Sequence, residues 1–318
     1  MRTLLYHTGA LGDFITILPA LSVWKNEHHD DSITLFGRPE IGSFARHIGC
    51  VDEAMDVTLP GYAHLFSPGL TAKTADVIGA YSHAIIFSSS SLPLTGHCRR
   101  LGLMVLDQPP FPFGREHVVD YHLSLFKDAR LFSDLKRPRQ PQVPVPGDSL
   151  LASFSLVPEG ERFCVLHAGS GSRRKNWPLD RFVEIGEAVR NLGKTVVWLR
   201  GPAETSLRVP ATGLTIDNPA LPVLAAILSR TRLFLGNDSG VAHLSAAVGC
   251  RSIVLFGPSD PQVWSPRGER VRIIYKKVSC SPCHLAQTKT QSCDRVCLAN
   301  LSADEVLSEV IEFSALSQ

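Results

Sequence analysis

The sequence lacks the features that mark membrane-spanning and polyanion-binding proteins. No apolar run approaches the ~20 residues that a membrane-spanning helix requires, and the N-terminal segment turns polar by His7, too early for a signal peptide. Lys and Arg together number 32 against 30 Asp and Glu, so the formal net charge of +2 predicts no nucleic-acid partner. We therefore expect a cytoplasmic protein, and peripheral contact with a membrane surface is compatible with this composition.

The chain has the length and the apolar material for two domains. Its 318 residues suit two α/β units of roughly 150 residues each, and 44% of them are hydrophobic. Short β-rich runs alternate with longer helical patterns, which is typical of parallel sheets with crossover helices. The expected strands are 3–6, 33–36, 83–87, 163–167, 195–199, 233–235 and 252–256, and the expected helices are 14–25, 179–192, 221–230, 241–248 and 303–313.

A proline-rich segment separates the two halves. Residues 136–147 hold four prolines, and proline neither continues a helix interior nor pairs in a central strand. We expect an extended linker here, between an N-terminal domain at 1–140 and a C-terminal domain at 141–318. Both are expected to be doubly wound units that face each other across a cleft, and ligands in such sheets collect at the carboxyl ends of the strands.

A glycine-containing loop follows the first expected strand. Gly9 and Gly12 let the backbone turn sharply and approach a ligand closely, and Asp13 follows at the start of a helix. Asp13 at this position is either a helix cap, which is the commoner role, or a carboxylate that points into the cleft. The glycines do not have the full Gly-x-Gly-x-x-Gly spacing of a dinucleotide site.

A second loop, at 167–178, combines small residues with cations. Gly169 and Ser170 precede three consecutive basic residues that end on Lys175, and Pro178 then opens a helix. Free backbone N–H groups beside cations favour a phosphate. The pattern therefore predicts a phosphate cradle, with a solvated basic turn as the alternative.

Two further loops follow expected strands in the C-terminal half. Residues 235–243 lead into a helix whose free N–H groups favour a nearby phosphate. Asp238 and Ser239 can cap this helix, and His243 shares the face of Ser239 one turn along. Residues 256–261 form a rigid turn, with ligand contact and an ordinary tight turn as equal alternatives.

Four motifs in this order resemble those of bacterial glycosyltransferase family 9, which contains the ADP-heptose:lipopolysaccharide heptosyltransferases. They are Gly9-Ala10-Leu11-Gly12-Asp13 with Leu18-Pro19-Ala20-Leu21, Lys175-Asn176-Trp177-Pro178, Asn237-Asp238-Ser239-Gly240-Val241-Ala242-His243 and Phe256-Gly257-Pro258-Ser259-Asp260-Pro261. The resemblance implies a GT-B fold of two Rossmann-like domains, the first binding the acceptor and the second the nucleotide sugar. It also implies inversion at the anomeric carbon with no cofactor or metal required for catalysis, and the chain has no Asp-x-Asp motif.

The resemblance also implies roles for individual residues. Asp13 matches the proposed general base of the family, and Lys175 matches a lysine that contacts the donor phosphates and balances charge on the leaving group. Glu204 lies where a glutamate of the family binds the ribose. The implied donor-binding residues are Gly169, Ser170, Lys175, Glu204, Asp238, Ser239, Gly240 and His243, and the acceptor-binding candidates are Gly12, Arg99 and Arg100.

These features together predict a glycosyltransferase. The predicted donor is ADP-heptose or a similar nucleotide sugar, and the predicted acceptor is lipopolysaccharide or another saccharide of the cell envelope, free or lipid-linked. A sugar-nucleotide epimerase or hydrolase of the same fold is one alternative, but it would need several acidic residues in the cleft. A non-catalytic nucleotide-sugar-binding relative is the other, and the presence of both Asp13 and Lys175 argues against it.

Four of the eight cysteines cluster towards the C-terminal end. Cys280-x-x-Cys283 and Cys293-x-x-x-Cys297 have the spacing of a four-thiolate zinc site, and a cytosolic location argues against a disulfide framework. A structural zinc, an iron–sulfur centre and a loop of reduced or disulfide-bonded thiols all remain open. Four thiolates leave no open coordination position, so a zinc ion here would be structural.

Overall fold

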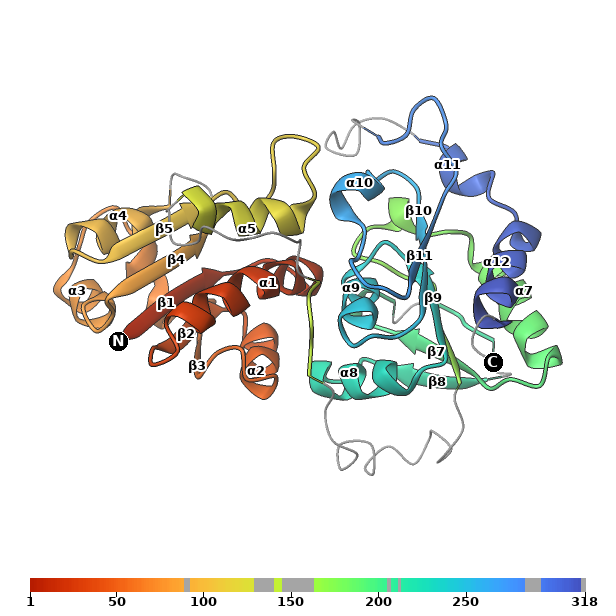
Figure 1. Cartoon of the computed structure of the whole chain (residues 1–318), viewed down its shortest axis with the longest axis horizontal. Coiled ribbons are helices and arrows are strands. Elements are labelled where there is room, and N and C mark those ends of the chain that lie inside the picture. Colours follow the sequence, from red (N-terminus) through yellow and green to blue (C-terminus); the bar gives the residue numbers. More distant parts are fainter. Residues whose placement is uncertain are drawn as a thin grey trace. The chain divides into compact units, whose positions relative to one another are not determined.

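Two parallel β-sheets, each in its own part of the chain, organise the fold (Figure 1). The computed structural model describes residues 1–88, 92–128, 140–144, 163–204, 207–210, 213–283 and 293–315. The chain divides into unit 1, Met1–Pro141, and unit 2, Gln142–Gln318. Of the predicted linker at 136–147, only 140–144 lies within the described residues, and it forms neither helix nor strand. Within those residues, no helix combines the length and the apolar character needed to cross a membrane.

Unit 1 is built on a five-stranded parallel sheet in the order β3-β2-β1-β4-β5. The order changes direction between β1 and β4, so the loops after these two strands flank the switch point where such sheets bind ligands. In chain order the elements are β1 (Arg2–His7), α1 (Leu11–Glu27), β2 (Ser32–Gly37), α2 (Pro39–His47), β3 (Glu53–Asp56), the 3₁₀ helix η1 (Pro60–Phe66), α3 (Ala72–Ile78), β4 (His83–Phe87), α4 (Pro93–Arg100), β5 (Met104–Gln108) and α5 (Val118–Asp128).

Unit 2 carries a six-stranded parallel sheet in the order β11-β10-β9-β6-β7-β8, with its switch point between β6 and β9. Its elements are β6 (Cys164–His167), η2 (Arg173–Lys175), α7 (Leu179–Asn191), β7 (Val196–Arg200), η3 (Pro202–Glu204), β8 (Leu214–Asp217), α8 (Leu221–Arg230), β9 (Leu233–Asn237), α9 (Gly240–Ala247), β10 (Ser252–Phe256), α10 (Pro261–Trp264), β11 (Val271–Tyr275), α11 (Val296–Ala299) and α12 (Ala303–Ala315).

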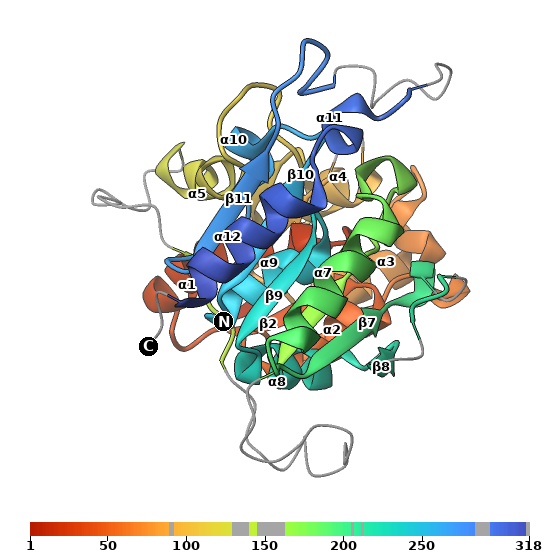
Figure 2. The same ribbon diagram turned by 90° about the vertical axis from the view of Figure 1, so that its right-hand side faces the viewer.

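Helices cover both faces of the unit 2 sheet. Figure 2 shows α7 and α12 side by side on one face, and Figure 1 shows α8 and α9 on the other. Because both faces are covered, the central strands β6, β9 and β10 are buried along their whole length and read as continuous apolar runs. Trp177 and Trp198 lie in the core between this sheet and the α7–α12 layer.

The two doubly wound parallel sheets confirm the predicted α/β fold class. β4, β10 and α8 have the predicted bounds, and the other predicted elements agree to within three residues at each end. α1 continues through Pro19 although proline removes a helical hydrogen bond, because the burial of eight consecutive residues, from Phe14 to Leu21, holds this helix in place.

Candidate active site

The loops that carry the predicted donor residues lie along one edge of the unit 2 sheet. β10, β9, β6 and β7 are neighbouring parallel strands, so their carboxyl ends and the loops that follow them are adjacent. The loops after β6 and β9 flank the switch point. The sequence motifs at 167–178 and 235–243 are therefore brought together at the position where doubly wound sheets bind ligands.

Asn237, at the end of β9, fastens these two loops to each other. Its side-chain Nδ2 donates to the carbonyl oxygens of Ala168 (2.9 Å) and Gly169 (3.3 Å), and its Oδ1 accepts from the backbone N–H of Trp177 at 2.9 Å. The side chain is fully buried, and a buried amide with its donor and acceptor both bonded fixes local geometry. Asn237 is not among the predicted site residues, although it begins the motif at 237–243.

Lys175 and Asp238 form an ion pair between the two loops. Lys175 Nζ lies 2.7 Å from Asp238 Oδ2, and the hydroxyl of Ser259 donates to the same oxygen at 2.5 Å. Asp238 is buried whereas Lys175 is about one-third exposed. The loop after β10 thus contributes directly to the site through Ser259, which lies within the motif at 256–261 but is not among the predicted donor-binding residues.

The N-terminus of α9 completes this part of the site. Ser239 is the N-cap, and its hydroxyl accepts from the backbone N–H of Ala242 at 3.3 Å. Gly240 is the first helical residue, and His243 is buried one turn further along. The capped end of a helix presents partial positive charge from its first N–H groups. This end therefore lies next to Lys175 and Asp238 with a charge that suits a phosphate.

Glu204 packs against the small-residue loop after β6. Its Oε2 accepts from the backbone N–H of Gly201 at 2.9 Å and lies 3.7 Å from Nε2 of His167. Burial by itself raises the pKa of Glu204, but the His167 ring and the backbone N–H groups of Gly201 and Ser170 lower it below its ordinary value. Glu204 is therefore a buried carboxylate whose negative charge is already stabilised by the His167 ring and by backbone N–H groups.

The side chain of Ser170 also forms its hydrogen bonds within the loop. Its hydroxyl lies 2.7 Å from the carbonyl oxygen of Ser172 and 2.6 Å from Oδ1 of Asn176, and it accepts from the N–H of Ser172 at 3.2 Å. These bonds hold the loop in a tight turn. Because the Ser170 hydroxyl is bonded within the loop, we expect the loop to contact a ligand mainly through its backbone N–H groups.

Substituting Gly169 with alanine is expected to displace Glu204. An added Cβ would lie 2.0 Å from Glu204 Cγ, far inside van der Waals contact. We expect a destabilisation of roughly 1–3 kcal/mol from overpacking, together with weaker nucleotide binding, measured by thermal unfolding and calorimetry. Gly171→Ala is the matched control, because its Cβ would meet no described atom within 4 Å. Equal effects of the two substitutions would contradict this assignment.

In unit 1, Asp13 lies in the first turn of α1 and caps it. Its Oδ2 accepts from the backbone N–H of Ala10 at 3.0 Å. The point where a Cβ on Gly9 would stand is 2.9 Å from both Asp13 Oδ2 and His7 Cε1, so the loop turns too closely for any residue but glycine. The capping role that the sequence offered for Asp13 is confirmed, and its role as a base stays a prediction.

Two buried histidines lie near this loop. His7 ends β1 and packs edge-on against Phe14 and Phe87, and His122 from α5 packs edge-on against the same Phe87. Burial lowers the pKa of His7 to about 4, helped by the charge of Arg38, and lowers that of His122 to about 3, helped by the other histidines. Both Nδ1 atoms are buried and have no hydrogen-bond partner among the described residues. Both rings are therefore neutral at pH 7.

The predicted acceptor residues of unit 1 are not gathered at one place. Gly12 is in the first turn of α1, next to Asp13. Arg99 and Arg100 end α4, which leads back to the amino end of β5, and Arg99 forms an ion pair with Asp107. The topology thus places the backbone of the two arginines away from the strand ends that carry Asp13, while the Arg99 side chain reaches Asp107, near the carboxyl end of β5.

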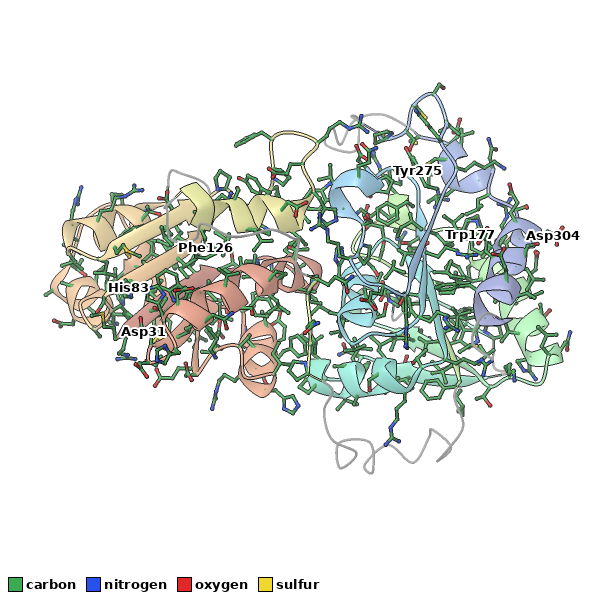
Figure 3. All side chains as sticks on the ribbon, viewed as in Figure 1. Asp31, His83, Phe126, Trp177, Tyr275 and Asp304 are labelled. Atoms are coloured by element: carbon green, nitrogen blue, oxygen red, sulfur yellow. The ribbon has the colours of Figure 1, made fainter. Side chains whose placement is uncertain are left out.

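A second polar cluster lies at the amino ends of the strands in the unit 1 sheet. His83 at the start of β4 lies 3.1 Å from Asp31, which precedes β2 (Figure 3). Burial by itself raises the pKa of Asp31, but its hydrogen bonds, including the one from His83, lower it below the ordinary value. This cluster is at the amino ends of the strands, so it supports the fold and not a ligand site.

The clustered cysteines fall in two described stretches, 280–283 and 293–297, which contact the loops after β10 and β6 respectively. Cys280 and Cys293 are exposed, Cys283 is half-buried and Cys297 is buried, all as free thiols. In the described part of the chain, no group of three or more His, Cys, Asp or Glu side chains is arranged to hold a metal ion. Zinc and iron–sulfur binding stay predictions, which elemental analysis of the purified chain tests.

The second of these stretches and the residues that follow it also contact the loop at 167–178. The guanidinium of Arg295 donates to the carbonyl oxygens of Arg173 and Asn176, at 3.2 and 3.4 Å. The indole N–H of Trp177 donates to the carbonyl oxygen of Leu301 at 2.9 Å. These contacts join positions more than a hundred residues apart, and the sequence offers no signal for them.

Comparison with known proteins identifies the family of this chain. The profile described as glycosyltransferase family 9 (heptosyltransferase) matches residues 94–293. Lipopolysaccharide heptosyltransferase 3 of Escherichia coli is 25% identical over 165 residues, which span 49% of this chain and 48% of that protein. Lipooligosaccharide heptosyltransferase 2 of Campylobacter jejuni is 22% identical over 319 residues, spanning 94% of both chains. The match thus spans about half the length of the first relative and most of the second.

A solved structure shows the same fold. The E. coli ADP-heptose LPS heptosyltransferase II superposes with a TM-score of 0.77 over 99% of both chains, at 16% sequence identity. At this identity the likeness establishes the GT-B fold alone. The profile match covers more than half of the 318 residues and includes three of the four sequence motifs. The chain belongs to glycosyltransferase family 9.

Proposed function

We propose that this protein transfers a sugar from a nucleoside diphosphate donor to a saccharide of the bacterial cell envelope. The observation that carries the proposal is the convergence of Lys175, Asp238 and the capped N-terminus of α9 at the switch point of the unit 2 sheet. A cation beside a helix N-terminus suits a diphosphate. Family membership supports the same reaction class.

In the proposed reaction, the donor side stabilises the leaving group. The C–O bond between the sugar and the diphosphate breaks, and negative charge grows on the departing nucleoside diphosphate. Lys175 and the first N–H groups of α9 offset this charge, because preorganised hydrogen-bond donors stabilise the charge that develops in a transition state. They supply the positive charge without a catalytic metal or other cofactor.

On the acceptor side, Asp13 removes the proton from the attacking hydroxyl. Attack from the face opposite the leaving group inverts the anomeric carbon. Unit 1 is the proposed acceptor domain and unit 2 the proposed donor domain, with boundaries near residue 140. Gly12 lies beside the base, whereas Arg99 and Arg100 would contact a more distant, anionic part of the acceptor.

The proposed donor is ADP-heptose, and the proposed acceptor is lipopolysaccharide or lipooligosaccharide. This finer proposal is supported by the names of the relatives, which are heptosyltransferases of those two glycolipids. Such an acceptor places the enzyme at the cytoplasmic face of the inner membrane, as a peripheral protein. Glu204 and His243 complete the proposed donor pocket, Glu204 on the ribose side.

The proposal is tested by calorimetry and by product analysis. ADP-heptose is expected to bind, with ADP-glucose and UDP-glucose as probes of the sugar and the base. Transfer to a heptose-deficient lipopolysaccharide should persist in EDTA, and NMR of the product should show the inverted anomeric configuration. If no nucleotide sugar binds, the proposed function is wrong; if binding occurs without transfer, the non-catalytic alternative replaces it.

A further inference from the structure

A buried carboxylate holds the lysine that is proposed to bind the donor phosphates. Asp238 Oδ2 accepts from Lys175 Nζ at 2.7 Å and from the Ser259 hydroxyl at 2.5 Å. The Asp238 side chain is 6% exposed and that of Lys175 is 36% exposed, so the lysine can reach a ligand while the carboxylate stays in place. A diphosphate that binds Lys175 must therefore compete with an anion already bonded to it.

We infer that Asp238 is an internal counter-ion that exchanges with the diphosphate for Lys175, and that Ser259 is the positioning residue that holds Asp238 through the exchange. The inference rests on the proposed nucleoside diphosphate site. It assigns to Ser259 a role in the reaction. Lys175 would leave Asp238 when the donor binds and return to Asp238 when the nucleoside diphosphate is released.

The physical basis is the high cost of an unpaired buried charge. Without ligand, Lys175 and Ser259 both satisfy the Asp238 carboxylate. When Lys175 turns to a diphosphate, Ser259 remains as a hydrogen-bond donor to the carboxylate and keeps it from being left unpaired. Asp238 also repels the diphosphate, because both are anions. After transfer, this repulsion and the return of Lys175 to Asp238 favour release of the nucleoside diphosphate.

Ser259 is held rigidly enough to play this part. Its neighbour Asp260 caps α10 by accepting from the backbone N–H of Gln262 at 3.0 Å. On the other side, the backbone N–H of Cys283 donates to the carbonyl oxygen of Pro258 at 2.7 Å. Asp238 is fixed by its own backbone N–H, which donates to the carbonyl oxygen of Leu255 at 3.1 Å. Both partners are thus anchored, and Lys175 is the member that can move.

Binding of ADP, with UDP and GDP as base controls, tests the exchange by calorimetry on four variants. Asp238→Asn removes the competing charge, so the affinity for ADP should rise by roughly tenfold. Ser259→Ala leaves the carboxylate dependent on Lys175, so the affinity should fall by about fivefold or more. Ser259→Thr keeps the hydroxyl and should restore wild-type affinity. In Asp238→Asn/Ser259→Ala, removal of the serine hydroxyl should have no further effect.

The opposite signs distinguish exchange from structural damage, which would weaken binding in both single variants. Ser252→Ala is the matched control, because this buried serine is on β10 but bonds to Ser245 at the other end of the strand; it should leave ADP affinity unchanged. If the wild type binds ADP but both single variants shift in the same direction, the exchange is wrong and the proposed function stands. If the wild type binds no nucleoside diphosphate, both are wrong.

Discussion

Replacing Asp13 with asparagine is expected to lower the rate of sugar transfer by roughly 10²–10⁴-fold, the usual contribution of a general base. Asparagine keeps a side-chain oxygen that can accept the N–H of Ala10, the bond that Asp13 makes at the start of α1. It cannot take a proton from the acceptor hydroxyl. The affinity for the donor should remain close to that of the wild type, because the proposed donor residues are all in unit 2.

The structural and catalytic roles of Asp13 are separated by comparing Asp13→Asn with Asp13→Ala. Alanine removes the cap as well as the base, and loss of a capping side chain costs about 0.5–2 kcal/mol. The unfolding temperature should therefore fall further for the alanine variant than for the asparagine variant, while both variants lose transfer activity to a similar extent. Near wild-type turnover in the asparagine variant would show that Asp13 only caps the helix.

Acidification from pH 6.5 to pH 4 is expected to destabilise unit 1 through His7 and His122. Burial lowers their pKa values to about 4 and about 3 from an ordinary value of 6.5. Between these values the unfolded chain binds protons that the folded unit does not, so the free energy of unfolding falls as the pH falls. Each histidine contributes a loss of roughly 3 kcal/mol by pH 4. Above about pH 8 the histidines are deprotonated in both states, so neither contributes a slope.

Hydrogen exchange of the β1 and β4 amides measures this loss in unit 1 separately from unit 2. His122→Phe removes one titrating group while keeping a ring against Phe87, so the fall in protection between pH 6.5 and 4 should become shallower. His29→Gln is the control: His29 is exposed in the same unit and its replacement should leave the slope as in the wild type. An unchanged slope in His122→Phe would show that the ring is already protonated or solvated when folded.

The sequence by itself determined the central strands and the loops that follow them. Strands such as β6, β9 and β10 are covered on both faces, so almost every position selects an apolar residue and the run is visible without a structure. The four strands it missed are β3, β5, β8 and β11, the outermost strands of the two sheets. Their positions are largely half-buried or exposed, so they carry polar residues that conceal the pattern.

The tertiary structure decided how the motif residues are bonded. The motifs placed Lys175 and Asp238 at the ends of strands, but only the strand order makes β6 and β9 neighbours and lets the two side chains pair. In the same way it brought Ser259 to Asp238 and Glu204 to His167. Local sequence sets backbone shape over a few residues, whereas ion pairs and buried hydrogen bonds depend on which distant strand lies alongside.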